Sequence, residues 1–92
     1  MNNELLPIGS VIKVKNIEKK AFIVGFLGID SDKPDKKYDY ICYTYPEGFM
    51  NRNFTILLDK EDIESVCFKG YITSESKELN QQITDYVNKE RD

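Results

Sequence analysis

The sequence predicts an α+β domain that is mainly β, with a small curled antiparallel sheet or barrel of about five strands and a C-terminal helix. Three observations predict this fold class. Short runs of branched and aromatic residues, separated by polar or turn-forming residues, recur up to residue 71. Gly25 and Gly28 interrupt the longest apolar run, where they favour a bulge or bend that curls a sheet. A stripe of apolar residues at helical spacing follows only near the end.

The strands follow from the local pattern of apolar residues. In the first, Ile12 and Val14 alternate with residues on a partly wet face, and the short polar link 16–20 suits a hairpin. The segment 30–37 is polar and predicts a loop, and Pro46 to Gly48 end the next strand with turn chemistry. The expected strands are 11–15, 21–29, 38–45, 54–58 and 65–68.

A single helical turn is expected after the fourth strand. Asp59 stands at an N-cap position, and Glu61 and Asp62 in the first turn would complement the helix dipole. Ile63 and Val66 are predicted to point inward from this region.

The C-terminal helix is expected over about residues 75–90, after several candidate caps. Its apolar stripe should pack on the sheet or plug one end of a barrel, because a short isolated helix is marginal in water. Partner binding through the helix is the alternative. The stripe consists of Leu79, Ile83, Tyr86 and Val87.

The length of 92 residues indicates a single domain, 1–92, with a strand-rich core over 5–71. The net charge of −3 offers no excess positive field for nucleic acid or anionic membranes, so neither is an expected partner. The chain begins without a basic, apolar signal segment, and its longest apolar run is too short to cross a bilayer. We therefore expect a cytoplasmic protein.

The inventory of reactive side chains argues against transition-metal chemistry. The sequence has no histidine, and its two cysteines, Cys42 and Cys67, cannot make a zinc site alone. Both cysteines lie in apolar, strand-like stretches, so they are predicted to be reduced core residues. We expect no metal and no cofactor.

Two acidic clusters are better explained by structure than by chemistry. The segment from Asp30 to Asp35 is superficially similar to a calcium loop, but it lacks the glycine at position six and has Ile41 at position twelve. The carboxylates of 59–64 suit helix capping. With no histidine and no nucleophile or phosphate-binding motif, the chain is not expected to be an enzyme and has no candidate catalytic residue.

The tyrosines are the candidate functional feature. Four of them lie along 38–45, on both faces of the expected strand, and an aromatic residue and Met50 follow the turn. Exposed aromatic and Met side chains favour protein-binding surfaces. The alternative is that each tyrosine packs its ring and leaves its hydroxyl in water. The candidate partner-binding residues are Tyr43, Tyr45, Pro46, Glu47 and Phe49.

Five segments, in this order, carry a family resemblance: Leu6-Pro7-Ile8-Gly9-Ser10-Val11, residues 19–25, Tyr38-Asp39-Tyr40, Tyr45-Pro46-Glu47-Gly48 and residues 61–71. Over about residues 5–71 the chain resembles the bacterial family of domain of unknown function 4176. The resemblance implies a Gram-positive setting beside type VII secretion genes and their toxins. It implies a cytoplasmic accessory, targeting, chaperone or immunity role, with a secreted toxin as client. It brings no catalytic residues.

Three hypotheses of function remain. The first is a non-catalytic protein-binding domain that recognises a type VII secreted toxin or secretion component through the corner 43–49. The second is a small-ligand-binding or hydrolytic domain that combines a carboxylate of 59–64 with a tyrosine hydroxyl. The third is a nucleic-acid-binding small barrel, which would need a stripe of cations. Those cations would be Lys13, Lys15, Lys19 and Lys20.

Overall fold

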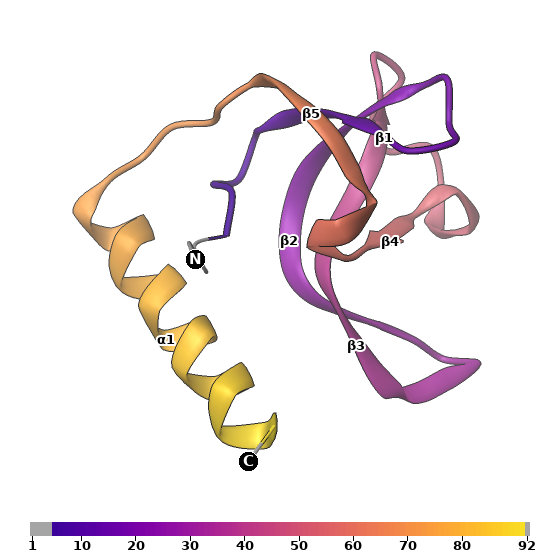
Figure 1. Ribbon diagram of the computed structural model, residues 1–92. Helices are drawn as coiled ribbons and strands as arrows, with labels where there is room; N and C mark the ends of the chain where they lie inside the picture. The colour runs from indigo at the N-terminus through magenta and orange to yellow at the C-terminus, as the bar shows by residue number, and fades with distance from the viewer. Residues whose placement is uncertain (1–4, 92) are drawn as a thin grey trace.

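The computed structural model describes residues 5–91 as a curled five-stranded antiparallel sheet followed by a C-terminal helix (Figure 1). The strand order across the sheet is β4-β3-β2-β1-β5. The predicted fold class is therefore confirmed. The strands are β1 (Val11–Val14), β2 (Lys20–Asp30), β3 (Lys33–Tyr45), β4 (Ile56–Leu58) and β5 (Ile63–Phe68), and the helix is α1 (Ser74–Arg91).

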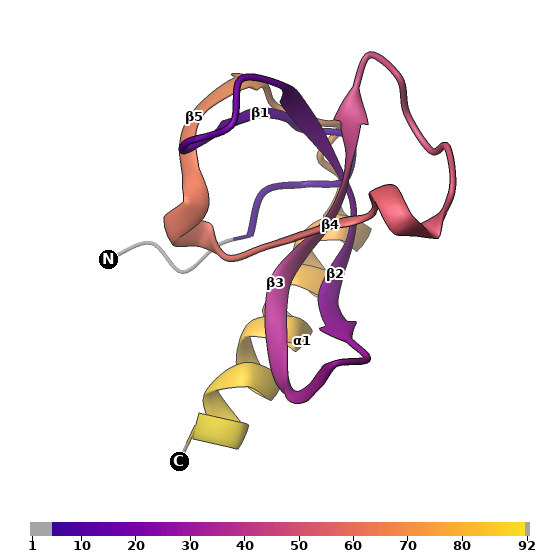
Figure 2. The ribbon, with the colours of Figure 1, turned by 90° about the vertical axis from the view of Figure 1, so that its right-hand side faces the viewer.

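The sheet curls because its two outer strands are neighbours in the chain. β4 and β5 lie at opposite ends of the strand order, yet only residues 59–62 join them. A link of this length cannot span a flat sheet of five strands, so the two ends must approach each other (Figure 2). The link contains a 3-10 turn, Lys60–Asp62, at the place where the sequence predicts a helical turn after Asp59.

The bend in β2 lies at the predicted glycines. Val24 is an extra residue in the ladder with β3, and Leu27 has a positive φ of 54°. A Cβ at Gly28 would overlap the side chains of Leu57 and Ile41, so the glycine leaves room for these two side chains to pack on the strand. A bulge of this kind increases local twist, which lets β2 and β3 serve both halves of the curled sheet.

The core lies inside the curl. The fully buried side chains of Ile12, Ile23 and Cys42 come from three adjacent strands, and Tyr40 is buried beside them. The Tyr40 hydroxyl accepts a hydrogen bond of 3.0 Å from the backbone N–H of Leu6. Burial raises the pKa of this phenol. The interior is therefore apolar, and its tyrosine hydroxyl is satisfied by the backbone of the N-terminal segment.

The helix lies beside the N-terminal segment rather than inside the curl (Figure 1). The Asn80 side chain accepts from the N–H of Leu5 at 3.2 Å and donates to its carbonyl at 2.8 Å. Ile83 packs against the core, whereas Leu79 and Tyr86 of the same stripe are about half exposed. The apolar stripe is thus only partly covered by the described residues.

The prediction of a loop over residues 30–37 is wrong. β2 continues to Asp30 and β3 begins at Lys33, so the turn consists of residues 31 and 32. Asp30 pairs with Lys33 and Ile29 with Lys37, which leaves residues 34–36 as an irregular excess on β3. Extension of the existing hairpin ladder outweighs the poor strand propensity of this polar segment.

Two smaller expectations are also wrong, and a third, the inward position of Val66, is met only in part. Phe54 belongs to a 3-10 turn, Arg52–Phe54, whose N-cap Asn51 accepts from the N–H of Asn53 at 2.8 Å, so β4 begins later than expected. Val66 of β5 is paired with the buried Ile12 and so lies on the core side of the sheet, but it is about half exposed there. Cys67 is exposed, because it is the extra residue where β5 bulges against β1. A bulge breaks the alternation from which a buried position was inferred.

Candidate functional site

A row of four apolar side chains crosses the outer face of the sheet, opposite the core. Strand register places Phe68 of β5 opposite Val11 of β1, Val11 opposite Phe22 of β2, and Phe22 opposite Tyr43 of β3. Their neighbours in sequence, such as Ile12 and Cys42, are the buried ones. We call Phe68, Val11, Phe22 and Tyr43 the aromatic row.

Ring contacts extend the aromatic row to the turn after β3. The rings of Phe22 and Tyr43 are edge to face, with centroids 6.2 Å apart. Phe49 continues the series, with its ring centroid 5.2 Å from that of Tyr43. Phe49 is nevertheless 62% exposed, so one side of the series faces solvent.

An open groove of about 670 Å³ lies over three members of the aromatic row. Val11, Phe22 and Phe68 line it from the sheet, and Tyr45 and Pro46 line it from the turn. Phe68 is 62% exposed and Tyr45 is 48% exposed, which is unusual for large aromatic side chains that share one depression. The groove therefore presents apolar surface that the described residues leave uncovered.

The turn that holds the candidate residues is fixed by local contacts. The Tyr45–Pro46 peptide bond is cis, and Gly48, with a φ of 74°, donates from its N–H to the Thr44 carbonyl at 2.7 Å. Glu47 forms an ion pair with Lys19, and this hydrogen-bonded contact lowers the pKa of the Glu47 carboxyl from its ordinary value. The Lys19–Glu47 ion pair thus connects the turn after β3 to the link between β1 and β2.

The structure places the five predicted site residues at one corner, but in different roles. Tyr45 and Pro46 line the groove, and Tyr43 and Phe49 extend its aromatic surface beside it. Glu47 is engaged with Lys19. Sequence reasoning missed the other wall, which Val11, Phe22 and Phe68 supply. These residues sit in strands that were assigned mainly to the core.

Lysines flank the aromatic row along the same face. Lys13 of β1 is paired directly with Lys20 of β2, and Lys20 is paired with Tyr45 of β3. Lys13 Nζ lies 3.5 Å from a carboxylate oxygen of Glu64. Lys20 lines the groove and makes no ion pair within the part of the chain that the structure describes. The groove thus has one cationic side.

Comparison with protein families shows the family to which the chain belongs. The family model described as Domain of unknown function (DUF4176) matches residues 5–79, which include the whole sheet and the first turns of α1. The chain belongs to the DUF4176 family. No curated protein and no solved structure shows a significant match to it.

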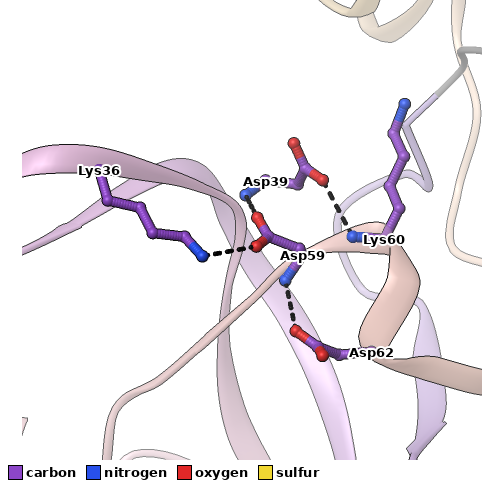
Figure 3. Close-up of polar contacts among 5 residues, drawn as sticks. All are labelled: Lys36, Asp39, Asp59, Lys60 and Asp62. Atoms are coloured by element: carbon purple, nitrogen blue, oxygen red, sulfur yellow. Dashed lines mark hydrogen bonds and ion pairs between the residues drawn. The ribbon is translucent and has the colours of Figure 1, made fainter.

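Two carboxylates of the segment 59–64 in this DUF4176 domain, those of Asp59 and Asp62, hold the link between β4 and β5 (Figure 3). The Asp59 carboxylate accepts from the N–H of Asp39 at 3.2 Å and pairs with Lys36 Nζ at 3.2 Å, a contact that raises the pKa of that ammonium. Asp39 in turn accepts from the N–H of Lys60 at 2.9 Å, and Asp62 accepts from the N–H of Asp59 at 3.0 Å. These carboxylates hold the link between β4 and β5 against β3.

A second cleft, of about 570 Å³, is lined by the N-terminal segment and α1. Leu5, Phe26 and Leu79 contribute apolar surface to it, and Asn80 and Asp85 contribute polar groups. No residue of 59–64 lines this cleft or the groove over the aromatic row. The pairing of a 59–64 carboxylate with a tyrosine hydroxyl therefore has no place in either depression of the DUF4176 domain.

The remaining reactive groups of the DUF4176 domain are its thiols. Burial raises the pKa of the Cys42 thiol to about 12, and this side chain has no exposed surface. Cys67 lines the groove as a free, exposed thiol. Within residues 5–91, no cluster of three or more Cys, Asp or Glu side chains could hold a metal ion.

The described part of the chain has no helix that is both long and apolar enough to cross a membrane.

Proposed function

We propose that this DUF4176 domain is a non-catalytic protein-binding accessory domain linked to type VII secretion, where it serves a secreted toxin as chaperone, targeting factor or immunity partner. The observation that carries the proposal is the open apolar groove over the aromatic row. Tyr and Phe side chains are enriched where proteins bind other proteins, because they bury large areas at a small cost in side-chain entropy.

The shape and lining of the groove support a macromolecular partner. It is open and shallow, and its lining includes one charged side chain, that of Lys20. Sites for small ligands usually enclose most of the ligand and place several polar groups around it. The exposed rings of Tyr45 and Phe68 are instead suited to be covered by the surface of another protein.

The link to type VII secretion comes from the family resemblance. A cytoplasmic domain that covers apolar segments of a toxin would keep the toxin soluble or inactive until export. The acidic balance of the chain, with a net charge of −3, would keep the free domain soluble despite its exposed aromatic groove.

Affinity capture from the native cytosol tests this function. Tagged wild-type protein should retain one stoichiometric partner, a toxin or a secretion component, and Tyr45→Ala should lose it because half of that ring is exposed in the groove. Ile29→Ala is the matched control, since Ile29 is 54% exposed at the far end of the β2–β3 hairpin. Leu79→Ala reports on the second cleft. Retention of no partner by any folded variant would refute the proposal.

A further inference from the structure

Lys13 and Lys20 stand directly opposite each other on neighbouring antiparallel strands of the outer face. Residues paired in this way have Cβ atoms about 5 Å apart, and two like charges at that separation repel each other. Glu64 neutralises the Lys13 ammonium, at 3.5 Å, from an exposed position on β5. The Lys20 ammonium has no such carboxylate within the described residues.

The unneutralised Lys20 borders the apolar groove. Lys20, Phe22 and Tyr45 line the groove together, so its walls combine aromatic rings with one cation. A carboxylate placed there would offset the repulsion between the paired lysines, and a bulky side chain beside it would cover the exposed rings. The Lys20 ammonium and the exposed rings therefore suit a ligand that combines a carboxylate with a bulky apolar side chain.

We propose that the groove recognises a segment of the protein partner in which a bulky apolar residue stands next to an Asp or Glu. The apolar side chain fills the groove between Phe22, Tyr45 and Phe68, and the carboxylate pairs with Lys20. This inference rests on the proposed function and adds the chemistry of the segment that is bound.

The sheet face, rather than the edge of β5, is the binding element. Among residues 5–91, β1 is the only strand paired with β5, so the described residues leave the outer edge of β5 open. Glu64 and Cys67 are both extra residues against β1, so two bulges interrupt a strand of only six residues. Bulges disturb the regular row of backbone groups that an added strand needs.

Two other occupants fit this face less well. A second copy of the chain, docked face to face with its twofold axis close to Lys20, would bring the Lys20 ammonium groups of the two copies together. Nucleic acid would meet the carboxylates of Glu64 and Glu47, which already hold two of the nearby lysines. A chain of net charge −3 adds no long-range attraction for phosphates.

The test is a nuclear magnetic resonance titration of the full-length, isotope-labelled chain with four short synthetic peptides. All have Gly/Ser flanks, and their central pairs are Trp-Glu, Trp-Gln, Trp-Lys and Ser-Glu. We expect Trp-Glu to shift the amide signals of Val11, Phe22 and Phe68, with about two- to fivefold weaker binding for Trp-Gln. Trp-Lys should bind more weakly still, and Ser-Glu should give no shifts at this face.

A charge reversal makes the test specific to Lys20. Lys20→Glu should reverse the order of the two charged peptides, so that Trp-Lys binds more tightly than Trp-Glu. Lys33→Glu, at the end of the β2–β3 hairpin, makes the same change of charge away from the groove and should keep the wild-type order. Both positions are exposed, so neither variant disturbs the core.

Three outcomes would overturn the inference. They are the absence of shifts at the groove with millimolar Trp-Glu, equal affinity for Trp-Glu and Trp-Lys, and an unchanged order in Lys20→Glu. Two further results would replace the inference with another occupant of this face. One is binding of a single-stranded oligonucleotide there that is tighter than the binding of Trp-Glu, and the other is a concentration-dependent dimer that Phe68→Ser abolishes. If the cytosolic partner is still lost with Tyr45→Ala while the peptides show no charge preference, the proposed function stands and only this inference fails.

Discussion

The backbone N–H of Gly70 donates a hydrogen bond of 3.0 Å to the hydroxyl of Ser10, which is completely buried. The same hydroxyl donates to the carbonyl of Pro7 at 2.7 Å. One side chain thus joins the segment before β1 to the segment after β5. Both segments border the groove or the second cleft, so this junction helps to fix the surfaces on either side of it.

Ser10→Ala should destabilise the domain, because it leaves the buried N–H of Gly70 without a partner. We expect a loss of about 1–3 kcal/mol in the free energy of unfolding. Gly70→Ala should cost more, since its Cβ would overlap the carbonyl oxygen of Ile8. Urea denaturation measures both changes. Ser65→Ala on the exposed part of β5 is the control, and an equal effect of Ser65→Ala and Ser10→Ala would contradict the role of the junction.

Asn80→Ala should loosen α1. The Asn80 amide satisfies both backbone groups of Leu5, so its loss should lower the free energy of unfolding by about 1–2 kcal/mol. It should also speed hydrogen exchange in α1 more than in β2 and β3. Gln82→Ala, at an exposed position of the same helix, should change stability by less than about 0.5 kcal/mol. Unaltered exchange in Asn80→Ala would show that the helix is held by other contacts.

The two thiols should differ sharply in reactivity. Cys67 is exposed in the groove, whereas Cys42 is fully buried and its pKa is raised to about 12. Alkylation of the native protein near neutral pH should modify Cys67 alone, and both thiols should react in denaturant. Peptide mass spectrometry assigns the sites. Rapid modification of Cys42 in the native state would mean that the core opens far more readily than its burial indicates.

Stability should fall at alkaline pH because of Cys42. Its pKa rises from an ordinary value of 9.0 to about 12 on folding, so above about pH 9 the unfolded chain releases a proton that the native chain retains. The stabilisation that the protonated Cys42 thiol gives the native state is complete below pH 9 and is lost as the pH rises towards 12. The free energy of unfolding should fall by up to about 1.4 kcal/mol per pH unit in this range. Urea denaturation between about pH 8 and pH 10.5 measures the slope. Cys42→Ala should flatten it, and an identical slope in that variant would assign the effect to Tyr40 and other groups.

The fold class could be predicted because the strands carry a strong local signal. The apolar run 21–29 and the alternation at Ile12 and Val14 required no knowledge of their partners, and both correspond to strands. The polar segment 33–37 could not be recognised as strand, since its extended form depends on pairing with β2. Cys67 was misplaced for a related reason, because bulges are set by the register between strands and leave no mark in the composition of one strand.

The site could be predicted only in part. The turn at Tyr45 and Pro46 was visible as a local cluster of aromatic and turn-forming residues. Phe22 lies between two buried residues, Ala21 and Ile23. All three are apolar, so the sequence gives no sign that Phe22 faces outward into a groove. The groove arises from residues of β1, β2, β3 and β5 that become neighbours only in the folded sheet.

The most direct test of the proposed function is photo-crosslinking from the groove in the native cytosol. A photoreactive phenylalanine analogue at position 68 replaces a ring that is 62% exposed, so it should leave the fold intact. The same analogue at position 29, exposed at the far end of the hairpin, is the control. We predict one discrete crosslinked partner from position 68 and none from position 29. No product from position 68, or the same products from both positions, would contradict the assignment of the groove as a protein-binding site.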